Sequence, residues 1–158
     1  MGNSHFVSSS TVVPVTADVA FQALLDAPLE KLFPHRSGPI PAIARCEGQE
    51  GSWSTVGQTR SVVLADGTSN LETLVGLERP HDYRYRITEI QGPFKLLVTS
   101  IDGRFTFEEE AGATRATWSW ELHGRTPLSR LVFPALDFFW GRWAAAMWPH
   151  YKAMALTA

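Results

Sequence analysis

This sequence of 158 residues has almost no cysteine, and that scarcity limits its chemistry. Cys46 is the only one, so an internal disulfide cannot form, and a reducing cytoplasm is the compartment we expect. The sequence also lacks a Cys-x-x-Cys pair and a His-x-x-x-His pair, the spacings that commonly hold metals. We therefore expect neither a metal nor a cofactor.

The sequence also lacks a cluster of basic residues. Its 14 Lys and Arg residues are scattered and are outnumbered by 16 Asp and Glu residues, for a formal net charge of -2. A protein that binds nucleic acid normally presents clustered positive charge. Nucleic acid is therefore not an expected partner.

Long uninterrupted hydrophobic runs are missing as well. The most apolar stretch, residues 126–156, is broken by Asp137, Gly141 and Arg142. The pieces that remain fall short of the roughly 20 apolar residues that a membrane-spanning helix needs. The first six residues show neither a signal-peptide pattern nor a myristoylation motif, which again favours the cytoplasm.

What the sequence does contain is a strong helical pattern at its C-terminal end. Apolar residues recur there at the 3.6-residue period of a helix that packs on a core. The stripe consists of Val132, Leu136, Phe139, Trp140, Trp143, Met147, His150 and Met154. Pro134 suits the first turn of this helix, after a short turn at 128–133, whereas Pro149 predicts a kink or an early end.

The rest of the chain reads as a strand, two helices and then six strands, all within one expected domain of residues 1–158. Alternating apolar residues and turn residues delimit these elements. The expected ranges are a strand at 5–13, helices at 16–26 and 28–33, a proline-rich loop at 34–41, and strands at 43–47, 59–64, 69–77, 83–89, 95–109 and 114–122. We expect an α+β fold in which a curved antiparallel sheet receives the long helix.

This order of elements resembles the helix-grip fold of the START and Bet v 1-like superfamily. Short motifs sharpen the resemblance toward its polyketide cyclase/dehydrase-like branch. They are Gly38-Pro-Ile-Pro41, Gly57-Gln-Thr-Arg60, Asp66-Gly67, Glu72-Thr-Leu74, Tyr83-x-Tyr85-x-Ile87 and Thr117-Trp118. The resemblance indicates fold more strongly than chemistry, because this scaffold carries binding proteins, transport proteins, hormone receptors and a few enzymes.

The resemblance implies an elongated cavity between sheet and helix, since one helix cannot fill a strongly curved sheet. The side chains expected to line it and to contact a ligand are Tyr85, Leu97, Phe107, Trp118, Trp120, Phe139, Trp140 and Trp143, together with Arg60 and Glu72. With six Trp, three Tyr and nine Phe, the sequence leaves open whether these aromatics fill the cavity or only line it.

Arg60 and Glu72 are the charged residues of greatest interest. If the Asp66-Gly67 hairpin has a three-residue loop with a bulge, Arg60 lies opposite Glu72 and both face the side that the resemblance assigns to the cavity. A two-residue loop would put them on opposite faces. If paired, they form a structural ion pair, with contact to the polar end of a ligand as an additional role.

His35 and His150 are the candidates for a general base or a polar ligand contact. His5, His81 and His123 lie near strand ends or turns, and we expect them to be exposed to solvent. Together with Arg60 and Glu72, His35 and His150 are the catalytic candidates.

Phe138, Trp148 and Tyr151 lie on the helix face opposite the apolar stripe. Two interpretations remain open. Either the N-terminal helices or a loop cover these aromatics, or they form a patch through which the protein dimerises.

The function that these features favour is binding of a small hydrophobic, lipid- or polyketide-like molecule. The alternative is an enzyme of the polyketide cyclase, aromatase or dehydratase type that uses Arg60, Glu72 and a histidine. A protein-interaction module is a third class, for which the sequence offers only the back face of the helix as a partner surface.

Overall fold

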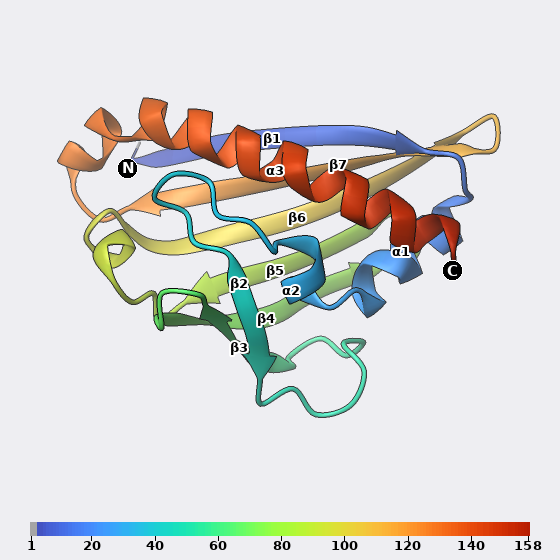
Figure 1. Cartoon of the computed structure of the whole chain (residues 1–158), viewed down its shortest axis with the longest axis horizontal. Coiled ribbons are helices and arrows are strands. Elements are labelled where there is room, and N and C mark those ends of the chain that lie inside the picture. The colour runs from blue at the N-terminus through green and yellow to red at the C-terminus, as the bar shows by residue number, and fades with distance from the viewer. Residues whose placement is uncertain (1–2) are drawn as a thin grey trace.

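The computed structural model describes residues 3–158, and they form the predicted order of strand, two helices, six strands and long helix (Figure 1). The elements are β1 (Ser4–Val13), α1 (Ala17–Asp26), α2 (Leu29–Leu32), β2 (Ile43–Glu47), β3 (Thr59–Leu64), β4 (Ser69–Glu78), β5 (Asp82–Thr88), η1 (Pro93–Leu96), β6 (Val98–Glu110), β7 (Ala113–Gly124), η2 (Pro127–Leu131) and α3 (Phe133–Leu156).

The strands form one curved antiparallel sheet with the order β1-β7-β6-β5-β4-β3-β2. β1 is an edge strand, as its position before Pro14 predicted. The α3 helix runs along the length of the sheet, next to β1, while α1 and α2 close the space near the C-terminal end of α3 (Figure 1). This is the helix-grip arrangement that the sequence predicted.

The proline-rich loop after α2 has a defined shape that ties it to α3. Ser37 and Ile40 exchange two backbone hydrogen bonds of 2.9 Å, and the Ser37 hydroxyl donates to the backbone carbonyl of Phe139 at 2.7 Å. Gly38 has a φ of +55°, and a Cβ there would lie 2.4 Å from the Phe139 ring. Only glycine combines this left-handed backbone with so close an approach to α3.

Both halves of α3 contribute buried side chains. In the C-terminal half, Met147, Trp148, Tyr151 and Ala155 are buried. In the N-terminal half, Leu136, Trp140 and Trp143 are buried as well, whereas Phe138 is exposed. Val132, immediately before the helix, is also exposed, although it belongs to the stripe that was predicted to face the core. Both halves of the helix are therefore anchored.

The dimer patch predicted on the back of α3 does not exist as such. Trp148 is only 5% exposed and donates from Nε1 to the Ser9 hydroxyl at 2.9 Å. The Tyr151 hydroxyl is buried and donates to the backbone carbonyl of Ala20 at 2.6 Å. Helix α1 thus covers Tyr151, as the first interpretation had it, whereas strand β1, which that interpretation did not name, covers Trp148. Of the three aromatics, only Phe138 is exposed.

Of the two outcomes predicted for Pro149, an early end of α3 does not occur, because the helix continues to Leu156. The strand predicted at 95–109 begins only at Val98, because η1 takes up its first residues, and its register shifts between Val98 and Ser100. No helix within residues 3–158 is long and apolar enough to cross a bilayer.

The burial of Trp148 leads to a prediction about stability. We expect Trp148→Glu to lower the free energy of unfolding by about 3–5 kcal/mol or more, because it removes a packed indole and buries a charge. Phe138→Glu is the control, and its exposed position predicts a change of about 0.5 kcal/mol or less. Urea denaturation measures both. If Trp148→Glu kept wild-type stability but sedimented as a smaller species than wild type, the result would support the dimer patch instead.

Candidate functional site: a cavity with a buried ion pair

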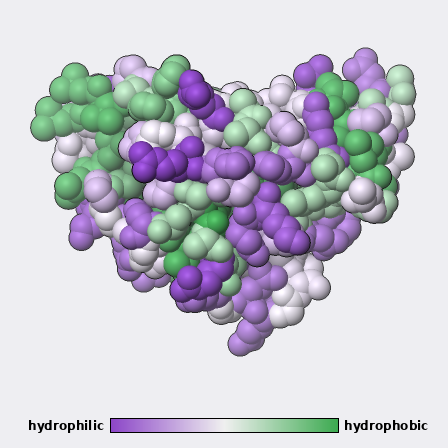
Figure 2. Space-filling view, viewed as in Figure 1, coloured by the Kyte–Doolittle hydropathy of each residue, from purple (hydrophilic) through white to green (hydrophobic). Residues whose placement is uncertain are grey.

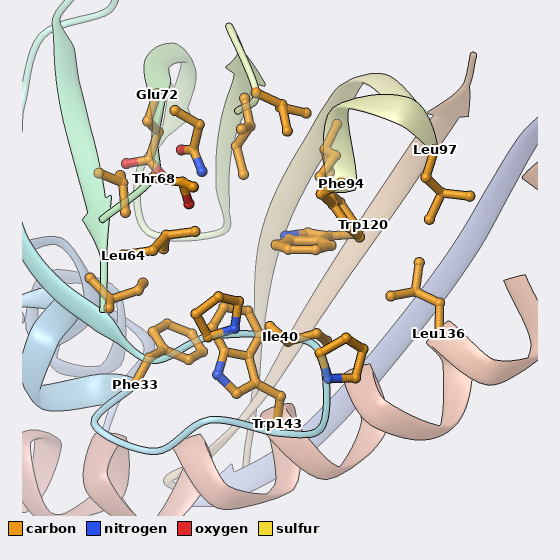
Figure 3. Close-up of a pocket in the computed structure, with 18 of the residues that line it drawn as sticks. Phe33, Ile40, Leu64, Thr68, Glu72, Phe94, Leu97, Trp120, Leu136 and Trp143 are labelled. Carbon is orange, nitrogen blue, oxygen red and sulfur yellow. The ribbon is translucent and has the colours of Figure 1, made fainter. Parts of the chain in front are cut away.

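A cavity of about 640 Å³ lies between the inner face of the sheet and the N-terminal half of α3. Figure 3 shows Phe33, Leu64, Trp120, Leu136 and Trp143 converging on it from the sheet, the helices and the loop after α2. The turns η1 and η2 border it at one end. The aromatics of this protein therefore line the space without filling it.

Arg60 on β3 and Glu72 on β4 meet on the wall of this cavity. They are paired in the β3–β4 register, which follows from a three-residue loop at 65–67. Arg60 Nε donates to Glu72 Oε2 at 2.6 Å, and the two residues are only 6% and 5% exposed. Of the two hairpin geometries that the sequence left open, the structure has the one that joins the pair.

The groups around Arg60 stabilise its positive charge. Its guanidinium lies 4.0 Å from the centre of the Trp53 ring, and Nη1 donates to Gln49 Oε1 at 3.1 Å. Burial acts to lower the pKa of Arg60, but Glu72, with smaller contributions from Tyr83 and Cys46, outweighs it and raises the pKa overall. Arg60 therefore remains a cation inside the fold.

Tyr85 forms a second polar point on the wall. Its hydroxyl accepts hydrogen bonds from Trp118 Nε1 at 2.8 Å and from Trp120 Nε1 at 2.9 Å. Burial, followed by the charge of Glu72, raises the pKa of Tyr85 well above its ordinary value, so it stays a neutral phenol. Its two acceptor sites are occupied, and the hydroxyl proton remains for donation.

Tyr85 can lie in this position because Gly103 is opposite it on β6. A Cβ at residue 103 would lie 2.0 Å from Cζ of the Tyr85 ring. Gly103 thus makes room for an aromatic ring. The neighbouring Tyr83 is also buried, and its hydroxyl accepts from Trp53 Nε1 at 2.9 Å.

Most of the residues predicted to contact a ligand do line the cavity, namely Arg60, Glu72, Tyr85, Leu97, Trp118, Trp120, Phe139 and Trp143. Phe107 and Trp140 do not. Phe107 packs edge-on against Phe21 of α1, and Trp140 lies against Trp118 at 4.6 Å, both about 1% exposed. These two are core residues because they lie behind the cavity wall.

The candidate histidines lie outside the cavity. His35 and His150 face each other with ring centres 5.8 Å apart, and neither is among the cavity-lining residues. His35 contributes instead through its backbone carbonyl, which accepts from Trp143 Nε1 at 3.2 Å. The structure thus joins Arg60 with Glu72 but brings neither histidine to them.

Asn70 is a cavity residue that the sequence analysis missed. It lies two residues before Glu72 on β4 and lines the same wall. Its side-chain oxygen is buried and has no hydrogen-bond partner among the described residues. The alternation of residues 70, 72 and 74 along the strand was the signal that could have identified it.

A polar cluster on the outer face of the sheet also escaped the sequence analysis. Asp102, Glu121 and His123 bring potential metal-ligand atoms within 4.8 Å of one another, which no linear spacing revealed. Burial acts to raise the pKa of Asp102, but bonds of 2.7 Å from Arg86 and His123 lower it overall. The Asp102 carboxylate is thus already held by Arg86 and His123, and His123 is half-buried instead of exposed.

His5 also departs from its expected exposure. It is half-buried, stacks on Phe133 with ring centres 4.7 Å apart and contacts the Asp137 carboxylate. His81 is exposed as predicted.

The buried pair predicts a specific pattern of coupling. We expect Arg60→Met and Glu72→Gln each to lower the free energy of unfolding by about 3–5 kcal/mol, because each leaves a buried partner uncompensated. The double variant should recover part of that loss. Denaturation of the four proteins gives the coupling energy.

The exposed pair Arg45 and Glu47 is the matched control, because its atoms lie at the same distance of 2.6 Å. We expect its coupling energy to be about 1 kcal/mol or less. Strictly additive effects of the Arg60 and Glu72 substitutions would contradict the buried pair.

The contact between Gly103 and Tyr85 yields a further prediction. Gly103→Ala should displace the Tyr85 ring, break its two indole hydrogen bonds and lower the free energy of unfolding by about 1–3 kcal/mol. Gly141→Ala is the control, because a Cβ there meets nothing within 4 Å and alanine favours the helix, so stability should rise. Thermal unfolding and tryptophan emission report on both. Unchanged stability and emission in Gly103→Ala would show that the ring is not held there.

Comparisons with known proteins agree with this geometry. Residues 4–148 match the family "Polyketide cyclase / dehydrase and lipid transport". No curated protein matches the sequence at a significant level.

Solved structures resemble the whole chain at low sequence identity. Ara h 8.0201 is 19% identical with a TM-score of 0.66, over 98% of this chain and 99% of its own. A major latex-like protein of Panax ginseng is 18% identical with a TM-score of 0.64, with the same coverage. Norcoclaurine synthase of Thalictrum flavum, solved with dopamine and hydroxybenzaldehyde, is 18% identical with a TM-score of 0.69, over 98% of this chain and 87% of its own.

At these identities the structural likeness establishes the fold alone. The family match covers residues 4–148 and does not depend on this structural likeness. The chain has the Bet v 1-like helix-grip fold and belongs to the polyketide cyclase/dehydrase and lipid transport family.

Proposed function

We propose that this protein binds a small, mainly apolar molecule of the lipid or polyketide type in the cavity under α3. The observation that carries the proposal is the cavity itself, whose volume of about 640 Å³ falls within the usual range of ligand sites, ~300–1,000 Å³. Its wall is largely aliphatic and aromatic, with Val62, Ile87, Ile101 and Leu136 among the lining residues.

The polar groups on the wall favour a ligand with one polar end. Glu72, Asn70 and Tyr85 line the same cavity, and the Asn70 oxygen is buried without a partner among the described residues. A buried acceptor left unpaired costs about 1–3 kcal/mol, which a ligand hydroxyl or amine would offset. Such a contact would fix the polar end of the ligand at this wall.

The enzyme alternative rests on the same pair. Norcoclaurine synthase shows that the fold can hold small aromatic reactants, and the family name includes cyclases and dehydrases. Acid–base catalysis, however, needs a proton-transferring group within reach of the substrate. Of the predicted catalytic residues, His35 and His150 do not line the cavity and Glu72 is engaged by Arg60, so the geometry favours binding. A catalyst built on this cavity would have to use the Tyr85 hydroxyl as its proton donor instead.

Filling the cavity should test the binding proposal. Leu97 points into the cavity opposite Leu136 (Figure 3), so Leu97→Trp should occupy ligand volume and weaken the binding of a fluorescent apolar probe by about tenfold or more. Leu156→Trp, at the exposed end of α3, is the control and should leave the dissociation constant unchanged. Equal affinities in wild type and Leu97→Trp would show that the probe binds outside this cavity and would contradict the proposal.

The double variant Arg60→Met/Glu72→Gln separates binder from enzyme. A binder keeps its affinity for the apolar probe in this variant. A catalyst that uses the pair would lose turnover of a polyketide-type substrate by about 10²- to 10⁴-fold while still binding it.

A further inference from the structure

Four aliphatic side chains are exposed around one end of the cavity. Leu96 on η1 is 71% exposed, while Leu128 and Leu131 on η2 are 70% and 79% exposed, and Val132 follows at 48%. Leu96, Leu128 and Val132 also line the cavity, whereas Leu131 does not. Three of the four therefore belong both to the cavity wall and to the surface, and we refer to the four residues as the leucine rim.

The rim is built on two turns that are tied together. The Ser129 hydroxyl donates to the backbone carbonyl of Leu97 at 2.6 Å, and the Arg125 backbone N–H donates to the same carbonyl at 2.9 Å. Arg125 Nε donates to the backbone carbonyl of Lys95 at 2.5 Å. The leucines are therefore presented by a defined platform that joins η1 to η2.

Contiguous patches of exposed aliphatic side chains are uncommon on the surface of soluble proteins. Figure 2 shows hydrophobic residues gathered at the end of the molecule where η1 and η2 lie in Figure 1. Scattered apolar residues need no explanation, but a patch that shares residues with the wall of an apolar cavity points to a partner that is itself apolar.

The charges around the rim identify the kind of partner. Residues 92–97 and 124–136 include Lys95, Arg125 and Arg130 and contain no Asp or Glu, although the whole chain has a net charge of -2. Asp137, the acidic group nearest in the sequence, contacts His5, and the acidic groups on the cavity wall are Asp66 and the paired Glu72. Basic side chains that flank protruding aliphatic ones are the combination that binds the interface of an anionic bilayer.

We propose that the leucine rim docks on an anionic lipid bilayer and opens the cavity toward it. Leucines of the rim enter the interface, while Lys95, Arg125 and Arg130 lie near the lipid headgroups. An apolar ligand then passes between bilayer and cavity without crossing water. An anionic bilayer fits the leucine rim better than a second copy of this chain does. The rim of a second copy would carry the same basic charges and repel the first, whereas an anionic surface attracts them.

The experiment is co-sedimentation with vesicles of phosphatidylcholine alone and of phosphatidylcholine with about 30% phosphatidylglycerol. We expect binding to the anionic vesicles, weakened by raising the salt concentration. Leu131→Ser should reduce the partition coefficient by about tenfold or more, because that side chain has no role in the cavity wall. Leu128→Ser, on the same turn, should reduce it similarly.

Leu156→Ser is the matched control, since Leu156 is 57% exposed but lies at the opposite end of α3 (Figure 1). Its vesicle binding should equal that of wild type. Leu131→Ser should also keep its affinity for the apolar probe, so a failure of docking remains separate from a failure of ligand binding.

Three results would overturn the proposal. One is that wild type does not bind anionic vesicles, and another is that Leu131→Ser and Leu156→Ser bind them as well as wild type. The third is self-association that Leu131→Ser abolishes in the absence of vesicle binding, which would make the rim an interface between copies of this chain.

Discussion

The structure depends on how α3 is fastened to the sheet. Its C-terminal half packs against β1 and α1, where Trp148 and Tyr151 are buried and hydrogen-bonded to Ser9 and Ala20. Its N-terminal half is held by Phe133, which stacks on His5 of β1, by Trp140, which packs against Trp118 of β7, and by the bond from Ser37 to the Phe139 carbonyl. A helix is stiff over this length and does not follow the curve of the sheet, so space remains between them beside these contacts. The cavity is the space that this arrangement leaves.

The polar wall of the cavity depends on a second constraint, the satisfaction of buried groups. Arg60 is buried with Glu72, Gln49 and the Trp53 ring as partners, and each would be costly without the others. Tyr85, on the same wall, accepts hydrogen bonds from the indole N–H groups of Trp118 and Trp120, so a single hydroxyl satisfies both buried donors. The wall is thus rigid on its polar side, a condition for orienting a ligand.

Much of the site could be read from strand alternation. Arg60 and Glu72 share a face once the hairpin loop is known, and the period of two also places Trp118 and Trp120 together. Alternation says which face a side chain occupies but not what lies above it. Phe107 therefore shares the face of the cavity-lining residues yet contacts Phe21 of α1, and Asn70 was overlooked although it lies beside Glu72.

The sequence alone determined the order of elements, most of their bounds and the two faces of the sheet, because propensity, turn residues and periodicity act locally. Only the tertiary structure decided which surfaces are covered. Trp148 and Tyr151 were predicted to lie opposite the apolar stripe, but whether they meet water or β1 and α1 depends on chain segments more than a hundred residues away. The same holds for His35 and His150, whose distance from the cavity is set by the packing of loop and helix. Burial is a property of contacts between distant segments, and no local pattern contains it.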